Sequence, residues 1–216
     1  MIELYDFYLS AAAFRVRIGL KLKGVDYRVI PVSLVKSGGE QHLAEYRTLN
    51  PQGLVPTITD DDFVLSQSLA ILEYLDDTYP APPFLPPEPA RRARVRQLAH
   101  LIVADVQSLT SLRVLAYLRT TLQANEQQRS LWVRHWLLEG LDALELWLTA
   151  EGPTHRYSLG NEVTLADICL VPLLVAARRF ALPLDDFPRL CEIEENCLAL
   201  PAFAEAHPEH PIQSMK

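Results

Sequence analysis

A dense cluster of prolines divides this chain. Six of the sixteen prolines lie within ten residues, between positions 80 and 89. Proline fixes φ and has no backbone N–H, so such a segment cannot form the interior of a helix or a central strand. It is typical of a stiff, extended linker. We therefore predict two domains, residues 1–80 and 90–216, joined by a linker of residues 81–89.

Strand and helix patterns alternate before the linker. Short apolar runs predict strands, and apolar residues at helical spacing predict helices. The expected strands are residues 2–8, 27–32, 55–59 and 63–66, and the expected helices are residues 11–23, 40–48 and 68–79. Three aspartates between the last two strands predict a hairpin turn, and Ser68 is the expected N-cap of the third helix. This order predicts an α/β domain with a parallel core and a hairpin at one edge.

The strand signal almost disappears after the linker. Residues 90–122 and 126–150 are long and amphipathic, and each predicts a helix. Thr164 stands three residues before Asp167, at the start of an apolar run. This spacing resembles a capping box, with aspartate in place of the usual glutamate or glutamine. The second domain is therefore predicted to be all-α.

Composition and charge disfavour several classes of protein. The net charge of −7 argues against nucleic acids and anionic membranes, although four arginines lie between positions 91 and 96. We interpret that run as a solvated helix end. The N-terminus has no basic segment of a signal peptide, and no uninterrupted apolar run reaches the roughly 18 residues of a membrane span. Cys169, Cys191, Cys197 and six scattered histidines fit no metal pattern. We expect no metal and a reduced, cytoplasmic compartment.

Three segments bring polar groups to the predicted carboxyl ends of the parallel strands. Ser10 begins a helix, where free N–H groups and the helix dipole stabilise an anion such as a thiolate. The peptide edge at Val55 and Pro56 can pair with an extended ligand. Gln67 and Ser68 begin another helix, which suits a carboxylate. Ordinary capping explains each serine taken alone, but the three segments together describe a pocket for a small thiol peptide.

Six motifs occur in order along the chain. They are RVRIGL (15–20), LKGVDY (22–27), LNPQG (49–53), VPT (55–57), QSLAILEYL (67–75) and TLAD (164–167). With these motifs the sequence resembles the zeta-class glutathione transferases, the family of maleylacetoacetate isomerase and bacterial maleylpyruvate isomerase, from about residue 2 to 210. The resemblance implies the glutathione transferase fold, in which a thioredoxin-like glutathione-binding domain precedes an all-helical substrate-binding domain. It also implies a homodimer.

The resemblance assigns roles to particular residues. The implied glutathione-binding residues are Ser10, Gln52, Val55, Pro56, Gln67, Ser68 and Gln107. Among these, Ser10 would donate a hydrogen bond to the glutathione thiolate. Val55 would pair with the cysteinyl backbone, with the Val55–Pro56 bond in the cis form. Gln67 and Ser68 would hold the γ-glutamyl carboxylate.

The sequence also departs from the family pattern. Leu9 stands where the family usually has an arginine that is a candidate anchor for an acidic substrate, and Ala11 and Ala12 replace residues that often carry a hydroxyl or thiol. Arg113 and Arg179 match positions where related isomerases carry arginine. We predict all of Leu9, Arg113 and Arg179 as substrate residues, with a solvated helix face as the alternative for the two arginines.

The resemblance implies a reaction. The enzyme would be a glutathione-dependent cis–trans isomerase of a maleylacetoacetate-like unsaturated keto acid, acting by thiolate addition, bond rotation and elimination. One alternative is a glutathione transferase that conjugates or dehalogenates small electrophiles. Another is a non-catalytic interaction module of the same fold. Tyr8 is the rival to Ser10 as the residue that activates the thiol.

Overall fold

The computed structural model describes residues 1–150 and 155–210, and these form two compact units. One unit is Met1–Phe84 together with the chain from Leu198 onward, and the other is Leu85–Cys197. The boundary after Phe84 falls inside the predicted linker. The C-terminal end differs from the predicted domain of residues 90–216, because helix α10 (Pro201–Ala206) packs on helix α1 (Ala11–Leu22). Positions 151–154 and 211–216 of that predicted domain lie outside the described residues.

A four-stranded sheet forms the centre of the first unit, with the strand order β2-β1-β3-β4. Strand β1 (Ile2–Asp6) runs parallel to β2 (Tyr27–Pro31). Strand β3 (Thr57–Asp60) is antiparallel to β1 and forms a hairpin with β4 (Phe63–Ser66). This sheet confirms the predicted parallel core with a hairpin at one edge.

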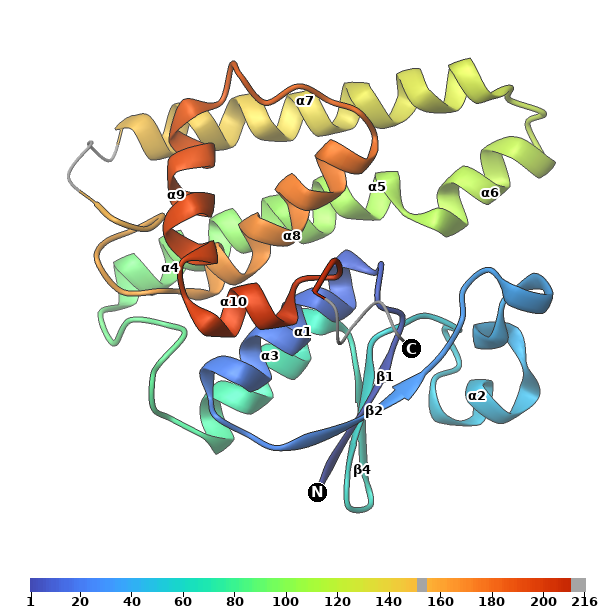
Figure 1. Ribbon diagram of the computed structural model, residues 1–216, viewed down its shortest axis with the longest axis horizontal. Coiled ribbons are helices and arrows are strands. Elements are labelled where there is room, and N and C mark those ends of the chain that lie inside the picture. The colour runs from blue at the N-terminus through green and yellow to red at the C-terminus, as the bar shows by residue number, and fades with distance from the viewer. Residues whose placement is uncertain (151–154, 211–216) are drawn as a thin grey trace. The chain divides into compact units, whose positions relative to one another are not determined.

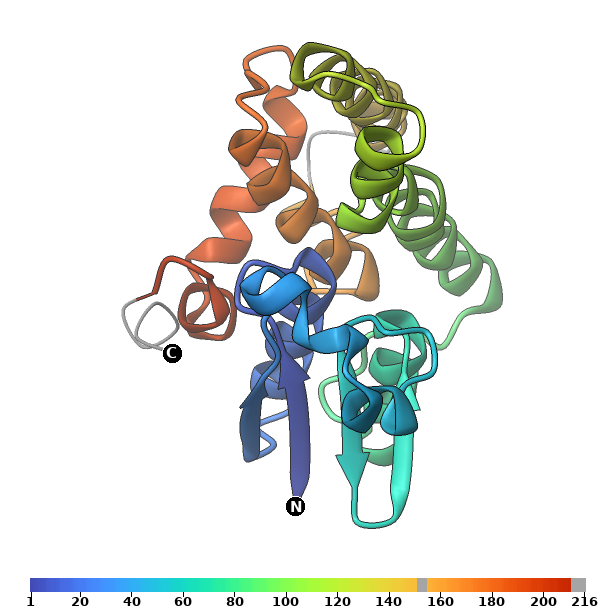
Figure 2. The same ribbon diagram turned by 90° about the vertical axis from the view of Figure 1, so that its right-hand side faces the viewer.

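Helices cover both faces of this sheet. Helices α1 and α3 (Ser68–Thr78) lie side by side on one face, and α2 (Ala44–Leu49) lies on the other, as Figures 1 and 2 show. The sequence predicted one helix over residues 40–48. The structure instead has a 3₁₀ turn, Glu40–His42, followed by α2, because Leu43 between them has an extended backbone with φ −65° and ψ 143°. A further 3₁₀ turn, Lys36–Gly38, is separated from Glu40–His42 by Gly39, which has φ 103°.

The first helix of the second unit is not continuous, contrary to the prediction for residues 90–122. Helix α4 (Pro89–His100) passes into a π-helical segment, Leu101–Gln107, and then into the short α5 (Ser108–Thr110). An extended residue, Ser111, with φ −69° and ψ 152°, separates this stretch from α6 (Leu112–Thr120).

Hydroxyl side chains bond back to the helix beside this interruption. Thr110 Oγ1 donates to the carbonyl of Val106 at 3.2 Å, and Ser111 Oγ donates to the carbonyl of Ser108 at 2.9 Å. Ser and Thr side chains that bond back to the helix compete with its own hydrogen bonds and bend it. The amphipathic spacing predicted the helix but not this competition.

The same stretch has an apolar surface. Pro89–Thr120 contains an 18-residue window with a mean hydropathy of 1.4, which by length and composition alone is enough to cross a membrane. Core helices of soluble proteins pass this test too, and one such helix is weak support for a membrane span. Only 11% of the window is fully buried, so part of its apolar surface is exposed or half-exposed in the described structure.

Three further helices complete the second unit: α7 (Glu126–Ala150), α8 (Leu165–Arg179) and α9 (Pro188–Leu198). Helix α8 is buried along almost its whole length. The predicted capping box is present at its start. Asp167 is completely buried and accepts hydrogen bonds from the backbone N–H groups of Thr164 and Ser158, both at 2.8 Å. The carboxylate therefore joins the start of α8 to the preceding loop.

Removing this carboxylate should destabilise the protein. Asp167→Ala leaves two buried N–H groups without an acceptor, and we expect a loss of about 2–4 kcal/mol in the free energy of unfolding. Urea denaturation measures this loss. Asp142→Ala, on the exposed side of α7, is the control and should change the free energy by less than about 0.5 kcal/mol. Equal midpoints for the two variants would contradict the role of Asp167.

Candidate functional site

The predicted site residues of the first unit lie together at one end of the sheet, where β1 and β4 finish and β3 begins; we call this end the sheet edge. Tyr5 of β1 pairs with Thr57 of β3, and Thr57 pairs with Ser66 of β4. The carboxyl end of β1, the amino end of β3 and the carboxyl end of β4 therefore lie at the same edge. The turn to Ser10, the Val55–Pro56 peptide and Gln67 all adjoin these strand ends. This is the arrangement predicted from the order of the elements.

Ser10 is the N-cap of α1. Its Oγ accepts a hydrogen bond from the N–H of Ala13 at 3.2 Å, and its own N–H donates to the carbonyl of Phe7 at 2.7 Å. The capping alternative from the sequence is thus observed. It leaves the hydroxyl hydrogen without an acceptor among the described residues. The hydroxyl can therefore donate to an anion while its oxygen still caps the helix.

The Val55–Pro56 bond is cis, as predicted. Two side chains hold the loop before it: Asn50 Nδ2 donates to the carbonyl of Leu54 at 2.8 Å, and Tyr46 Oη donates to the same carbonyl at 2.6 Å. The backbone N–H and carbonyl of Val55 have no partner among residues 1–150 and 155–210. A fixed loop with an open peptide group can pair with the backbone of an extended ligand.

The N-terminus of α3 differs in one detail from the prediction. Gln67 rather than Ser68 is the N-cap, because Gln67 has a non-helical backbone with φ 73° and ψ 112°, and Ser68 is the first helical residue. The Gln67 amide donates to Gln52 Oε1 at 2.6 Å. Ser68 is 4% exposed and its hydroxyl accepts from Arg15 Nε at 3.2 Å. The buried guanidinium adds positive charge where a carboxylate is predicted to bind.

Sequence reasoning missed the residues that support this edge. The motif of residues 15–20 contains Arg15 and Arg17 but does not indicate that both are buried, at 1% and 0% exposure. Their position in the sequence could have indicated this burial, since both arginines stand among apolar residues of one helix. Buried charges are rarely without partners, so buried arginines also indicate polar contacts nearby. Tyr46 and Asn50 gave no comparable signal, because their contacts depend on the loop conformation.

Tyr8 and Leu9 lie on the turn between β1 and α1. The strand ends at Asp6, so Tyr8 lies beyond it, with its ring packed edge-on against Phe7 at 5.4 Å between centroids. Their exposures are 38% for Tyr8 and 40% for Leu9. The tyrosine that lies on β1 itself is Tyr5, and burial raises the pKa of its phenol. Tyr8 remains the alternative to Ser10.

The other predicted residues belong to the second unit. Gln107 ends the π-helical segment, and its Oε1 is buried without a hydrogen-bond partner in the part of the chain that the structure describes. Arg113 on α6 and Arg179 at the end of α8 are both exposed. The roles of these three residues stay predictions.

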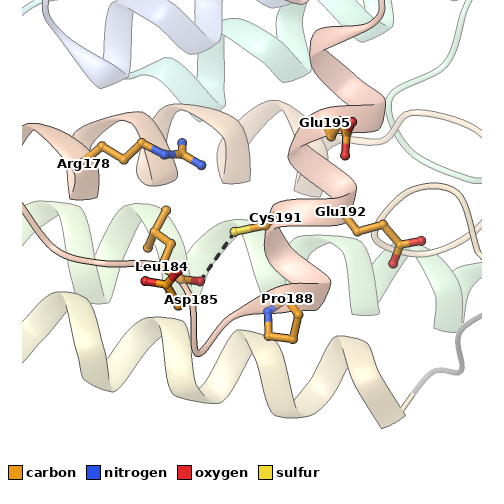
Figure 3. A pocket seen from close by; sticks show the side chains of 7 residues that line it. All are labelled: Arg178, Leu184, Asp185, Pro188, Cys191, Glu192 and Glu195. Atoms are coloured by element: carbon orange, nitrogen blue, oxygen red, sulfur yellow. Dashed lines mark hydrogen bonds between the residues drawn. The ribbon is translucent and has the colours of Figure 1, made fainter.

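A separate hollow of about 590 Å³ lies on the second unit, between α8 and α9 (Figure 3). Its lining residues are Arg178, Leu184, Asp185, Pro188, Cys191, Glu192 and Glu195. The Arg178 guanidinium is bound by the Glu194 carboxylate, and burial raises the pKa of the Cys191 thiol. Three carboxylates would repel an acidic ligand, so we do not assign the site to this hollow. Among the described residues no three His, Cys, Asp or Glu side chains group as a metal site requires.

Two family models match the chain. Residues 4–83 match the N-terminal domain of glutathione S-transferase, the part that contains the sheet edge described above. Residues 104–201 match the C-terminal domain of the same family. This chain belongs to the glutathione S-transferase family.

Similar proteins place this glutathione S-transferase in the zeta class, which confirms the predicted resemblance. A maleylacetoacetate isomerase of Pseudomonas aeruginosa is 43% identical over 95% of both chains. The structure of a maleylpyruvate isomerase, described as a bacterial zeta-class enzyme, has a TM-score of 0.92 at 40% identity, covering 95% of this chain and 96% of that one. A maleylacetoacetate isomerase of Methylobacterium extorquens AM1, with bound malonate and glutathione, has a TM-score of 0.91 at 40% identity over the same shares.

Proposed function

We propose that this enzyme is a glutathione-dependent cis–trans isomerase of an unsaturated keto acid like maleylacetoacetate. The observation that carries the proposal is the single sheet edge with three docking features: the Ser10 hydroxyl, the open Val55 peptide and the N-terminus of α3 with Ser68. Zeta-class relatives of about 40% identity act as maleylacetoacetate or maleylpyruvate isomerases, which agrees with that arrangement.

The residues present fit glutathione. The hydroxyl hydrogen of Ser10 is available to an anion, and the open peptide of Val55 matches an extended backbone. Ser68, Gln67 and the free N–H groups of α3 match a carboxylate, with Arg15 behind them. When bound, glutathione supplies a thiolate that adds to the cis double bond and leaves after rotation, so that the trans isomer is released.

The chain's own groups would then divide the work. Ser10 donates its hydroxyl hydrogen to the sulfur anion and so lowers the pKa of the thiol. The N–H groups at the start of α1 add a fixed positive potential there. Gln52 steadies the Gln67 side chain, and Gln107 is the predicted contact from the second unit. Arg113 and Arg179 are the predicted holders of the substrate's acid group.

Leu9 favours a second candidate function. An apolar side chain with 40% exposure, one residue from Ser10, suits an electrophile with an apolar or halogenated end. The activated thiol would then attack a carbon that bears a halide, in a conjugation or dehalogenation. Both functions use the same glutathione site and differ in the substrate.

Two measurements test the proposed function. We expect the protein to be retained on glutathione resin and released by free glutathione, and to convert maleylacetoacetate or maleylpyruvate to the trans isomer only when glutathione is present. A halogenated acid in the same panel tests the second candidate. A protein that does not bind glutathione would contradict both functions and favour an interaction module.

We also propose that this enzyme is a cytoplasmic homodimer, in which the first unit of one subunit pairs with the second unit of its partner. Two exposed apolar surfaces support this pairing. Phe63 and Val64, on the edge strand β4, are 46% and 40% exposed. The window within Pro89–Thr120 is apolar and only 11% buried. Surfaces of this kind mark protein–protein interfaces.

Charge on the edge strand should dissociate the dimer. We expect wild type to run as a dimer in light scattering at micromolar concentration, and Val64→Glu to shift the mass toward the monomer, because an unpaired buried carboxylate is costly. Val35→Glu, at a residue with 69% exposure in the loop after β2, should leave the mass unchanged. A monomeric wild type would refute the proposal.

A further inference from the structure

The Arg17 side chain is fully buried inside the first unit, with 0% exposure. Each part of its guanidinium has a different partner. Nη1 donates to Asp6 Oδ1 at 2.7 Å, Nη2 donates to the carbonyl of Tyr8 at 3.0 Å, and Nε donates to the carbonyl of Ala206 at 3.0 Å. The guanidinium carbon also lies 5.3 Å from the centre of the Phe14 ring. One side chain therefore joins the end of β1, the following turn and the end of α10.

The turn contacted by Arg17 carries Ser10. Tyr8 lies two residues before Ser10, and the carbonyl of Phe7 accepts the N–H of Ser10 at 2.7 Å. The hydrogen bond from Arg17 to the Tyr8 carbonyl limits the movement of this short turn. A hydroxyl that must donate to an anion depends on such fixing, since a shift of about 1 Å is enough to lose much of the bond.

The ionisable groups around Arg17 are consistent with a lasting ion pair between Arg17 and Asp6. Burial raises the pKa of the Asp6 carboxyl, and the Arg17 cation acts against that rise. Burial also raises the pKa of Tyr27 to about 12, so the phenol nearby stays neutral. Asp6 is thus the anion that Arg17 faces. The ion pair between α1 and α10, Lys21 with Glu205 at 2.7 Å, lies on the surface and does not reach the turn.

We propose that Arg17 is a positioning residue for the thiolate site: it ties the turn that carries Ser10 to the C-terminal helix α10. The proposal rests on the proposed function. Lysine cannot replace arginine here, because an ammonium is a point charge and lacks the planar fork that reaches three acceptors at once. The C-terminal segment, distant in sequence from Ser10, then contributes to the acidity of the bound thiol.

The test uses the full-length protein saturated with glutathione, and it measures the pKa of the bound thiol from thiolate absorbance against pH. Arg17→Lys should raise this pKa by roughly 0.5–1 unit, which reduces the thiolate about three- to tenfold at a pH below the thiol pKa of wild type. The kcat/KM for isomerisation should fall by the same factor and recover at high pH. A purely structural role would lower the melting temperature without changing the thiol pKa of the folded protein.

Two further variants complete the experiment. Lys21→Ala removes the exposed link between α1 and α10, and should leave the bound thiol pKa unchanged. Asp6→Asn weakens one of the three contacts that hold the Arg17 guanidinium, so the loosened turn should raise the thiol pKa. The rise should be smaller than in Arg17→Lys, because losing the nearby anion acts in the opposite direction and favours the thiolate. If Arg17→Lys does not fold, the thiol pKa of Asp6→Asn tests the role of Arg17 in its place.

The outcomes separate this inference from the proposed function. If wild type does not lower the thiol pKa of glutathione, the proposed function fails. If wild type lowers it and neither Arg17→Lys nor Asp6→Asn changes it, only the role of Arg17 is refuted. If Lys21→Ala raises it as much as Arg17→Lys does, general loosening of α10 explains the effect and the specific role of Arg17 is overturned.

Discussion

Replacing Ser10 with alanine should raise the pKa of the bound glutathione thiol by roughly 1–2 units. The hydroxyl would donate to an anion, and hydrogen bonds to charged groups contribute about 1.5–3 kcal/mol, at 1.36 kcal/mol per pKa unit. At a pH below the thiol pKa of wild type, the thiolate fraction and kcat/KM should fall about 10- to 100-fold, and between the two pKa values the fall should be smaller. Above the raised pKa the thiol ionises again, so part of the activity should return. The affinity for glutathione should change little, because other groups hold the peptide.

The controls for this prediction follow from the structure. Ser10 also caps α1, so alanine should cost about 1 kcal/mol of stability as well. Ser10→Thr keeps both the cap and the hydroxyl, and should retain the low thiol pKa. Tyr8→Phe tests the rival donor and should have no effect. An unchanged pKa in Ser10→Ala would transfer the role to Tyr8 or to the backbone N–H groups.

Local patterns predicted most of the first unit and the edge that carries the site. The alternation of strands and helices fixed the order of the elements, and the order was sufficient to bring Ser10, Val55 and Gln67 to one edge. Propensity and periodicity are local properties, and these elements follow them. The sequence also predicted the capping box of Thr164 and Asp167, which depends on residues three positions apart.

Features that depend on distant contacts were not predictable in this way. Pro201 indicates locally where helix α10 begins, but no local pattern indicates that this helix packs on α1. The contact of Arg17 with Ala206 joins residues 189 positions apart. Serine favours the N-cap position, which predicts Ser68 for α3, whereas the structure has Gln67 there with φ 73°. Tertiary structure overrides propensity at these places, and all of them lie in the first unit with the site.

Replacing Leu9 with arginine should increase kcat/KM for a diacid such as maleylacetoacetate by about 5- to 150-fold, equivalent to 1–3 kcal/mol. Leu9 stands one residue before Ser10 and is 40% exposed, so its side chain can meet a substrate. A guanidinium there would hold a carboxylate through two parallel hydrogen bonds, whereas leucine offers only apolar contact. For the same reason Leu9→Arg should lower kcat/KM for a monoacid with a halogenated end.

The acid recognition that remains in wild type is predicted to come from Arg113 or Arg179. Alanine at the responsible residue should raise KM for the acid substrate, and Arg119→Ala, on the same exposed helix as Arg113, should not. Steady-state kinetics on maleylacetoacetate for these variants and Leu9→Arg decides between two explanations. If wild type already works at the rate of related isomerases and Leu9→Arg brings no gain, another basic residue replaces the missing arginine and our interpretation of Leu9 is wrong. If Arg113→Ala and Arg179→Ala both keep full activity, those arginines belong to the solvated surface, and the leucine at position 9 marks a substrate with less acid character.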